Sequence, residues 1–397
     1  MVNDWEYSRM KEKAGLYIHI PFCASECGYC AFAKLEDTEE LKRQRSIFLK
    51  SIRTELEFQY NRFSENLDFN TLYIGGGTPS LLSISETEEL FESIYVITGQ
   101  DFEEISFDCN PEDLADDNDY VKCLEQSGVN RLTIGVQTLS DKGLKVLERK
   151  ANQQNIIRMA ESLPKTFKGQ ISYDIILGWP DQNLEDFIEH DEPFLKNFIY
   201  DHLSLYLLNY EPGTRLNRDI KHGKLNKLNE DTCANIWEHC LKVVRESGME
   251  QYEISSFCNN NKQSIHNVGT WKGQPYLGIG PGAVSRVASE RWTNTKSLSR
   301  YLSNIQNAGS SIEDTEVITA TIAWQDELIF SMRYKEGINR NEFISKHGFD
   351  LCEKIKSSIK IGVEEGHLLN VNNRLKFTPL GWNFFDAYIS DWMLIIE

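Results

Sequence analysis

Short apolar runs rich in β-branched and aromatic residues recur along the first half of the chain, and segments with helical spacing separate them. Apolar strands that alternate with helices favour a parallel sheet covered on both faces. Six such units predict an α/β fold, a partial (β/α)6 barrel of the TIM type, whose functional site lies at the C-terminal ends of the strands. The six runs are Leu16–Phe22, Thr71–Gly75, Glu104–Cys109, Arg131–Val136, Gln170–Leu177 and His202–Leu208.

The segment after the second run carries a signal for the start of a helix. Ser85 and Glu88 have the spacing of a capping box. Leu90, Phe91 and Ile94 follow at helical spacing. We therefore expect a helix that begins near Ser85 and packs on the sheet.

The alternation of strands and helices stops after about residue 210, and the next hundred residues show a mixed pattern. From about Asp314 the pattern predicts three helices, then a hairpin over Leu368–Thr378 that turns at Asn372-Asn373, and a last helix that ends at Trp392. The chain is thus expected to comprise an N-terminal tail (1–14), the barrel (15–210), a connecting region (211–310) and an α-rich, winged-helix-like C-terminal domain (311–397). For that last domain we expect a packing role rather than DNA binding.

Composition and charge narrow the class of protein. The 397 residues are 40% hydrophobic and 26% charged, with a formal net charge of -18. Such acidity disfavours nucleic-acid partners, which bind through phosphate neutralisation, although it leaves room for a local basic patch. The N-terminal residues 1–13 have no apolar signal-peptide core, and no stretch is long and apolar enough to span a bilayer. We expect a soluble cytoplasmic protein with at most peripheral membrane contact.

A loop directly after the first run contains Cys23, Cys27 and Cys30, spaced C-x3-C-x2-C. Three thiolates so close in sequence can hold three corners of a cubane iron–sulfur cluster. No fourth cysteine follows in the loop, so one iron would be free to bind another ligand. Zinc is the alternative, and it would need a fourth ligand; His19, four residues before Cys23, is the nearest imidazole. The other six cysteines are scattered and resemble small buried hydrophobes.

Further candidate residues lie at the ends of the predicted strands. The turn Gly75-Gly76-Gly77-Thr78-Pro79 follows the second strand and would let a ligand approach the backbone closely. Asp108 ends the third strand, where a carboxylate could meet ribose hydroxyls. Gln137, Arg149 and Asp174 follow at or near the later strand ends. A tight turn, a helix cap at Asp108 and a buried ion pair at Asp174 are the alternatives.

Several short sequence motifs of the chain, taken together, resemble those of one family. Tyr17-Ile-His-Ile-Pro-Phe-Cys23, Gly75-Gly-Gly-Thr-Pro-Ser80, Gly135-Val-Gln137 and Gly280-Pro-Gly282 are similar to the oxygen-independent coproporphyrinogen III oxidase (HemN/HemW) branch of the radical S-adenosylmethionine (SAM) superfamily. The resemblance implies that Cys23, Cys27 and Cys30 hold a [4Fe-4S] cluster, and it singles out no catalytic residue. It also implies a set of SAM contacts: Tyr17, Gly76, Gly77, Thr78, Asp108, Gln137, Arg149 and Asp174. Asp108 stands where the family usually has Glu, and Lys150-Ala151 where it usually has His after the arginine.

Two departures separate the branches of that family. The true oxidases have a further cysteine where this chain has Phe32, and they carry a longer N-terminal arm. The sequence His266-Asn267 with Trp271 resembles the HNxxYW motif of the heme chaperone HemW branch, with Thr270 in place of Tyr. The resemblance thus makes His266 a candidate heme ligand, since imidazole is a usual axial ligand of heme iron. A histidine that is hydrogen-bonded in a loop is the alternative.

The resemblance implies a heme chaperone that binds a [4Fe-4S] cluster, SAM and heme and transfers heme to an acceptor protein. Its alternative is a radical SAM enzyme that oxidatively decarboxylates porphyrinogen propionates, so whether the chain is an enzyme is left open. A third reading, a radical SAM enzyme that modifies nucleic acid, is disfavoured by the charge. The expected partners are heme, the acceptor protein and an electron donor for the cluster, with no nucleic acid; a homodimer is left open.

Overall fold

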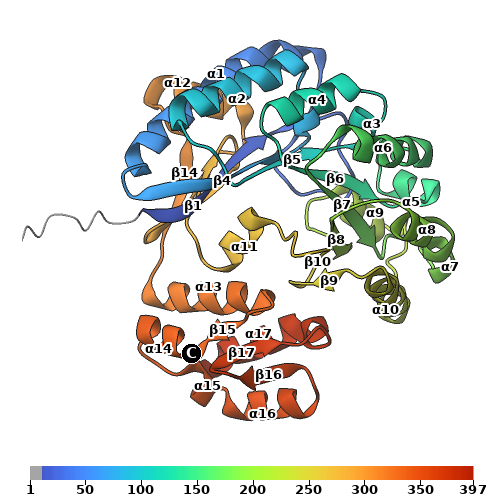
Figure 1. Ribbon diagram of the computed structural model, residues 1–397, viewed down its shortest axis with the longest axis vertical. Helices are drawn as coiled ribbons and strands as arrows, with labels where there is room; N and C mark the ends of the chain where they lie inside the picture. The colour runs from blue at the N-terminus through green and yellow to red at the C-terminus, as the bar shows by residue number, and fades with distance from the viewer. Residues whose placement is uncertain (1–10, 397) are drawn as a thin grey trace, which may run out of the picture.

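The computed structural model describes residues 11–396. A curved sheet runs through its upper part, helices cover the outer face of that sheet, and a smaller C-terminal part lies below (Figure 1). Six parallel strands form the middle of the sheet in chain order. They are β1 (Glu12–Ile20), β4 (Leu67–Gly76), β5 (Glu104–Cys109), β6 (Arg131–Gln137), β7 (Gln170–Leu177) and β8 (His202–Leu207). The partial barrel predicted from the sequence is confirmed.

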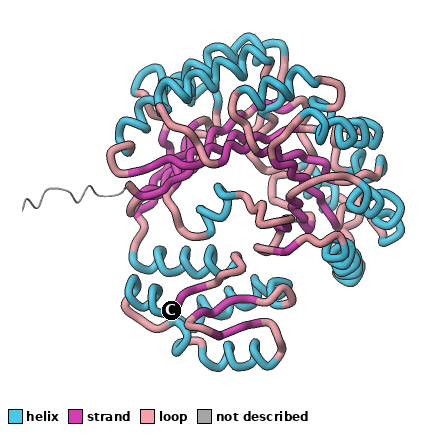
Figure 2. The backbone as a smooth tube through the Cα atoms, in the orientation of Figure 1, coloured by secondary structure: helices cyan, strands magenta, loops and turns pink. Residues whose placement is uncertain are grey.

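The connecting helices pack on the convex face of the sheet, as Figure 2 shows. Leu72, Phe107 and Ile134 point outward from successive strands into one buried core, where Phe48 and Phe91 from the helices meet them. The helices are α1 (Glu39–Phe63), α2 (Ile84–Thr98), α3 (Pro111–Leu114), α4 (Asn118–Gln126), α5 (Asp141–Val146), α6 (Gln153–Thr166), α7 (Leu184–Asp186), the π-helical turn η2 (Phe187–Asp191) and α8 (Glu192–Asn197).

The inner face of the sheet differs from the prediction of continuous apolar strands. Along β5, the apolar Ile105 and Phe107 alternate with the polar Glu104, Ser106 and Asp108. Successive side chains of a strand point to opposite faces, so one face meets the helices and the other faces the barrel lumen. The expectation of strands that are apolar on both faces was wrong, because only the outward-facing residues of each strand are apolar. The inward-facing residues make the lumen polar.

The sheet continues beyond residue 210, into the region expected only to connect the barrel to the C-terminal domain. β11 (Tyr276–Ile279) pairs parallel to β1, a pairing between segments far apart in sequence. At Gly280, which follows β11, an added Cβ would lie 2.5 Å from the carbonyl oxygen of His19, so this close approach requires glycine. The further strands are β12 (Val284–Val287), β13 (Glu290–Asn294) and β14 (Ile312–Val317) on that side, and β10 (Ser256–Cys258) and β9 (Glu250–Gln251) beside β8.

The helices of this region are α9 (Arg215–Lys221), α10 (Glu230–Glu246), α11 (Ile265–Trp271) and α12 (Leu298–Ala308). Of these, α11 lies on the concave side of the sheet, between the barrel and the C-terminal part (Figure 1). Its N-terminus is fixed by Glu104, whose carboxylate accepts hydrogen bonds from the backbone N–H groups of Ile265 and His266.

The C-terminal part has its own hydrophobic core. The predicted hairpin is present: Asn372 and Asn373 have φ of +52° and +61°, as a two-residue turn of type I′ requires. The expected helices are present but begin at Ala320, because Asp314 lies on β14, and the last helix continues past Trp392. The elements are α13 (Ala320–Arg333), β15 (Ile338–Asn339), α14 (Arg340–His347), α15 (Leu351–Lys354), α16 (Lys356–Glu364), β16 (Leu368–Val371), β17 (Arg374–Phe377) and α17 (Phe385–Ile396).

The start of α2 also differs from the prediction. Ser83, not Ser85, is the N-cap, and it forms a reciprocal capping box with Glu86. Both pairs have the required spacing, and the chain uses the earlier one because the short 3-10 turn η1 (Pro79–Leu81) ends just before it. Most of the predicted N-terminal tail lies outside the described residues. Within residues 11–396, no helix is both long and apolar enough to cross a membrane.

Candidate metal and cofactor site

The cysteine loop follows β1 and is closed by a small parallel ladder. β2 (Phe22–Cys23) pairs with β3 (Leu35–Glu36), and the chain between them forms the loop. The backbone N–H of Leu35 donates to the carbonyl of Pro21 at 2.7 Å. This closure holds Cys23 in a buried position and leaves Cys27 and Cys30 partly exposed. All three thiols are free.

Two side chains hold the loop from inside. Lys34 donates from Nζ to the carbonyls of Cys27 and Cys30, each at 3.0 Å. Nε2 of His19 bonds the carbonyl of Ala33 at 2.7 Å, and the other ring nitrogen bonds the Tyr17 hydroxyl at 3.0 Å. His19 therefore supports the loop and is not directed at a metal. Burial lowers the pKa of His19, which keeps the ring neutral.

A cavity of about 640 Å³ lies between this loop and the C-terminal ends of the parallel strands. We call it the strand-end cavity. The structure brings ten of the twelve residues that the sequence singled out to its wall, and Tyr17 and His266 are the two that do not line it. The ten are Cys23, Cys27, Cys30, Gly76, Gly77, Thr78, Asp108, Gln137, Arg149 and Asp174.

The glycines after β4 let the strand end lie directly against the cysteine loop. Gly76 has φ of +116°, a conformation that side chains rarely adopt. An added Cβ at Gly77 would lie 2.6 Å from the carbonyl oxygen of Phe22 and 2.9 Å from Sγ of Cys23. The bare backbone therefore forms one wall of the cavity. Next to it, the Thr78 hydroxyl donates to Sγ of Cys23 at 3.8 Å.

Two partly buried aspartates, Asp108 and Asp174, lie opposite the loop. Asp108 accepts a hydrogen bond from the Tyr73 hydroxyl at 2.7 Å. Burial raises the pKa of Asp108 to about 7, against the effect of that hydrogen bond, and burial raises the pKa of Asp174 to about 6, opposed by its hydrogen bond with Ser204. Oδ1 of Asp174 is buried and has no partner among the described residues. An unsatisfied buried oxygen is costly unless a ligand pairs with it.

Arg149 connects the loop with the strand ends. Nη1 donates to Sγ of Cys27 at 3.5 Å, and Nη2 donates to Oδ1 of Asn110 and to the carbonyl of Gly135, each at 2.8 Å. Its guanidinium thus places a positive charge beside a cysteine sulfur. Gln137 reaches the same wall with an unusual φ of +66°.

Several residues that build this site were not predicted from the sequence. Tyr73, which holds Asp108, and Tyr206, which lines the cavity, are inward positions of strands whose apolar residues point outward. Tyr29 and Asn110 also line it. The two-residue alternation along each strand could have identified Tyr73 and Tyr206. The loop residue Tyr29 gave no such signal.

Below the cavity, toward the N-terminal ends of the strands, lies a second polar cluster around His266. Nδ1 of His266 bonds the Thr71 hydroxyl at 2.9 Å, and its ring lies 5.3 Å from that of Tyr73. Glu104 accepts a third hydrogen bond in this cluster from the hydroxyl of Ser264. Burial lowers the pKa of His266 to about 4, so its imidazole is neutral at physiological pH.

The donor set suits a cluster better than a single metal ion. Among the described residues, no group of three or more His, Cys, Asp or Glu side chains converges on one point as a single ion requires. In a cubane cluster each cysteine binds a different iron, so the thiolates need only surround it. The glycine wall and the unpaired oxygen of Asp174 leave backbone and carboxylate groups for a second, polar ligand beside it. The residues present fit a cluster together with SAM.

Comparisons with known proteins agree with this geometry. Residues 17–193 match the model of the radical SAM superfamily. The heme chaperone HemW of Lactococcus lactis is 30% identical over 381 residues, covering 94% of this chain and 97% of that protein. The heme chaperone HemW of Bacillus subtilis is 29% identical over 381 residues, covering 94% of this chain and 99% of that protein.

A solved structure supports the fold. The coproporphyrinogen III oxidase HemN of Escherichia coli superimposes with a TM-score of 0.81, covering 97% of this chain and 90% of that one, at 19% sequence identity. At that identity the likeness concerns the fold alone, which extends over the barrel and the C-terminal part.

Proposed function

Because this chain belongs to the HemW family of radical SAM proteins, we propose that it is a heme chaperone that binds a [4Fe-4S] cluster and SAM and passes heme to an acceptor protein. The relatives that carry the name heme chaperone match this chain over nearly their whole length. The single observation that carries the proposal for the cofactors is the strand-end cavity, which gathers three free thiols, a glycine wall and an unpaired buried carboxylate oxygen.

In this proposal Cys23, Cys27 and Cys30 hold the cluster, and one iron is left for SAM. A bound and reduced cluster supplies the electron that cleaves a C–S bond of SAM. Lys34 and His19 keep the loop in shape through its carbonyls. Arg149 balances the charge of the Cys27 thiolate.

The wall opposite the loop is proposed to hold SAM. The strip from Gly76 to Thr78 presents backbone groups to the methionyl end, and Asp108 and Asp174 present carboxyls to polar groups of the ligand. Gln137 and Arg149 close the side of the cavity. Tyr17 contributes from the layer below, where it bonds His19 and lies 3.3 Å from the position of a Cβ on Gly75.

For heme we propose His266 as the axial ligand. Thr71 anchors its Nδ1, which leaves Nε2 for iron, and a partner on the other nitrogen is the usual way in which a ligating imidazole is oriented. The lowered pKa keeps the ring in the neutral form that binds metals. Because His266 faces the lumen and lines no cavity described above, heme can reach Nε2 only if the residues that cover this nitrogen move, while Thr71 keeps its bond to Nδ1.

The experiment that tests this function is an anaerobic assay of the reconstituted protein. We expect it to bind heme with saturation, to pass heme to apo-cytochrome or another heme-free acceptor, and to leave coproporphyrinogen III unchanged in the presence of SAM and a reductant. SAM-dependent decarboxylation of the porphyrinogen would overturn the proposal and would favour an oxidase.

A second measurement addresses the ligand. His266→Ala is expected to weaken heme binding by about tenfold or more, as loss of an axial bond should. The control is His222→Ala, which removes an exposed imidazole from the end of α9. Equal heme affinity of the two variants would place the ligand elsewhere in the chain.

A further inference from the structure

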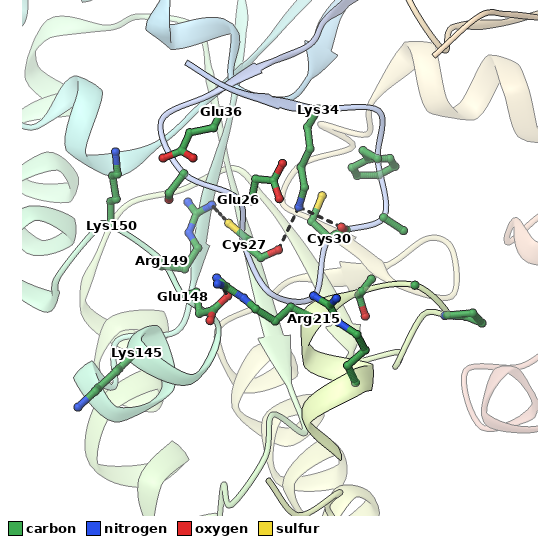
Figure 3. Close-up of a pocket in the computed structure, with 17 residues that line it drawn as sticks. Glu26, Cys27, Cys30, Lys34, Glu36, Lys145, Glu148, Arg149, Lys150 and Arg215 are labelled. Carbon is green, nitrogen blue, oxygen red and sulfur yellow. Dashed lines mark hydrogen bonds and ion pairs between the residues drawn. The ribbon is translucent and has the colours of Figure 1, made fainter. Parts of the chain in front are cut away.

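A second cavity of about 850 Å³ lies on the outer side of the cysteine loop, and we call it the basic groove. Figure 3 shows its wall, to which α5 contributes Lys145, the segment after α5 contributes Lys150, and α9 contributes Arg215. Arg218, also on α9, lines the groove as well. Lys34 and Arg149 line it from the side of the loop. The groove opens to the surface and adjoins the strand-end cavity, with which it shares part of its lining.

The charge of this groove is opposite to that of the chain. Six cationic side chains line it against three carboxylates, Glu26, Glu36 and Glu148, whereas the whole chain has a net charge of -18. One of the three carboxylates, Glu148, is paired with Arg215. Lys145 and Arg218 are exposed and make no ion pair with any residue between 11 and 396. A local positive field on an acidic protein concentrates and orients anionic partners.

The groove reaches the same cysteines as the strand-end cavity. Cys27 and Cys30 line both, and so do Lys34 and Arg149. A cluster on these thiolates would therefore lie where the groove and the strand-end cavity adjoin. A partner seated in the groove approaches the cluster without entering the SAM pocket.

We propose that the basic groove is the docking surface for a small acidic one-electron carrier that reduces the cluster. The proposal rests on the proposed function, because it needs the cluster. The carrier gives one electron to the cluster and is itself oxidised by one electron; no bond forms or breaks, and no proton has to move. The positive charge of the groove suits such a partner, because complementary charges steer the encounter of transient complexes.

The lining argues against heme in this groove. Only Ala31, Phe32 and Pro212 offer apolar surface, and they do not form the enclosed apolar slot that a porphyrin ring needs. Phe32, with 71% of its surface exposed, lies at the rim and is available to a protein partner. The acidic surface beyond the groove would repel a long polyanion such as nucleic acid.

The test compares two charge-reversed variants of the reconstituted full chain. Lys145→Glu with Arg218→Glu changes the groove, and Lys356→Glu with Lys360→Glu changes exposed lysines of α16 by the same net charge. The probe is a flavodoxin, a small acidic one-electron flavoprotein. Its affinity is measured by calorimetry and its rate of cluster reduction by stopped-flow absorbance, each at ~0.05 M and ~0.3 M salt.

At low salt we expect the groove variant to bind flavodoxin about tenfold more weakly than the α16 variant. We also expect flavodoxin to reduce its cluster about tenfold more slowly. Both differences should shrink at high salt. Dithionite, a small reductant, should reduce both clusters equally. Equal flavodoxin binding by the two variants, with intact clusters, would overturn the docking site. If the groove variant still binds flavodoxin but no longer binds heme, the groove is instead the binding site of the heme propionates.

The two proposals fail in different ways. If the wild-type chain forms no cluster, the proposed function fails before docking is tested. If the cluster forms and dithionite reduces it, but the groove variant and the α16 variant bind flavodoxin equally, only the docking proposal fails. Binding of flavodoxin can be measured on the oxidised protein, so it does not depend on turnover.

Discussion

The two ends of the barrel lumen use polar residues in different ways. At the N-terminal ends of the strands, Glu104 accepts hydrogen bonds from Ser106, Ser264 and two backbone N–H groups of α11. His202 likewise bonds both Ser172 and Tyr252. These groups satisfy one another and hold α11 in place, and we call this end the closed end, although Nε of Arg131, at the start of β6, is also buried there without a partner among the described residues.

The C-terminal end is incomplete by comparison. Oδ1 of Asp174, Nε of Arg149 and Oε2 of Glu112 are buried there without partners among the described residues. Three free thiols and a bare glycine wall face the same space. The difference indicates that Glu104 and His202 at one end stabilise the fold, whereas the thiols and Asp174 at the other end are arranged for ligands.

The largest expected effect comes from removing the thiols. Substitution of Cys23, Cys27 and Cys30 by Ala should reduce iron from ~4 per chain to none, because the remaining cysteine on the cavity wall, Cys109, is a single buried thiol and cannot hold a cluster alone. Iron analysis and the visible absorption of the reconstituted protein measure this. Cys233→Ala, on α10, is the control and should keep the cluster. A full cluster in the triple variant would contradict the assignment.

At the closed end, Glu104→Ala should lower the free energy of unfolding by roughly 3–5 kcal/mol, because it leaves several buried donors unpaired. The neighbouring Glu103→Ala, whose ion pair with Lys13 is exposed, should cost well under ~1 kcal/mol. Urea unfolding of both apo variants gives the values. Similar stability of the two variants would show that the polar cluster does not hold the fold.

The open end should respond to pH. The folded-state pKa of Asp108 is raised to about 7 by burial, above its value in the unfolded chain, so its contribution to stability is present at low pH and lost as pH rises toward 7. Asp108→Asn should therefore flatten the fall in unfolding free energy between about pH 5 and pH 7 by ~2 kcal/mol. Urea titrations of the apo protein at several pH values measure the slope. Part of the slope should remain, since burial also raises the pKa of Glu55 and Asp191 to about 7. An unchanged slope would mean that Asp108 is already ionised in the folded protein.

The smallest effect concerns one carboxylate at the open end. Asp174→Ala should weaken SAM binding by about tenfold, the loss expected for a charge-assisted hydrogen bond. Its iron content should stay at the wild-type level, since Asp174 does not contact the cysteine loop. Equilibrium dialysis with labelled SAM gives the affinity, and iron analysis is the internal control. Unaltered SAM binding would remove Asp174 from the site.

The strands could be predicted from the sequence because their outward residues, such as Phe107 and Ile134, are apolar and short helical segments separate them. The wall of the strand-end cavity could also be predicted, once the strands were located. In a parallel barrel all strand ends meet at one rim, so Asp108, Gln137 and Asp174 come together whatever the details of packing.

What could not be predicted depends on contacts between distant segments. The pairing of β11 with β1 joins residues about 260 positions apart in the chain, and no local pattern specifies it. The position of His266 in the lumen depends on the capping of α11 by Glu104, a contact that exists only in the folded barrel. Tyr17 lies one layer below the cavity because His19 occupies the position next to the loop.

The measurement that tests the difference between the two ends most directly is electron paramagnetic resonance of the reduced, reconstituted protein during titration with SAM. A cluster with one iron free of protein ligands should give a signal that changes saturably as SAM binds, and Glu104→Gln, at the closed end, should show the same change. An intact four-iron cluster whose signal is unaffected by saturating SAM would contradict the account, because the open end would then hold no second ligand beside the cluster.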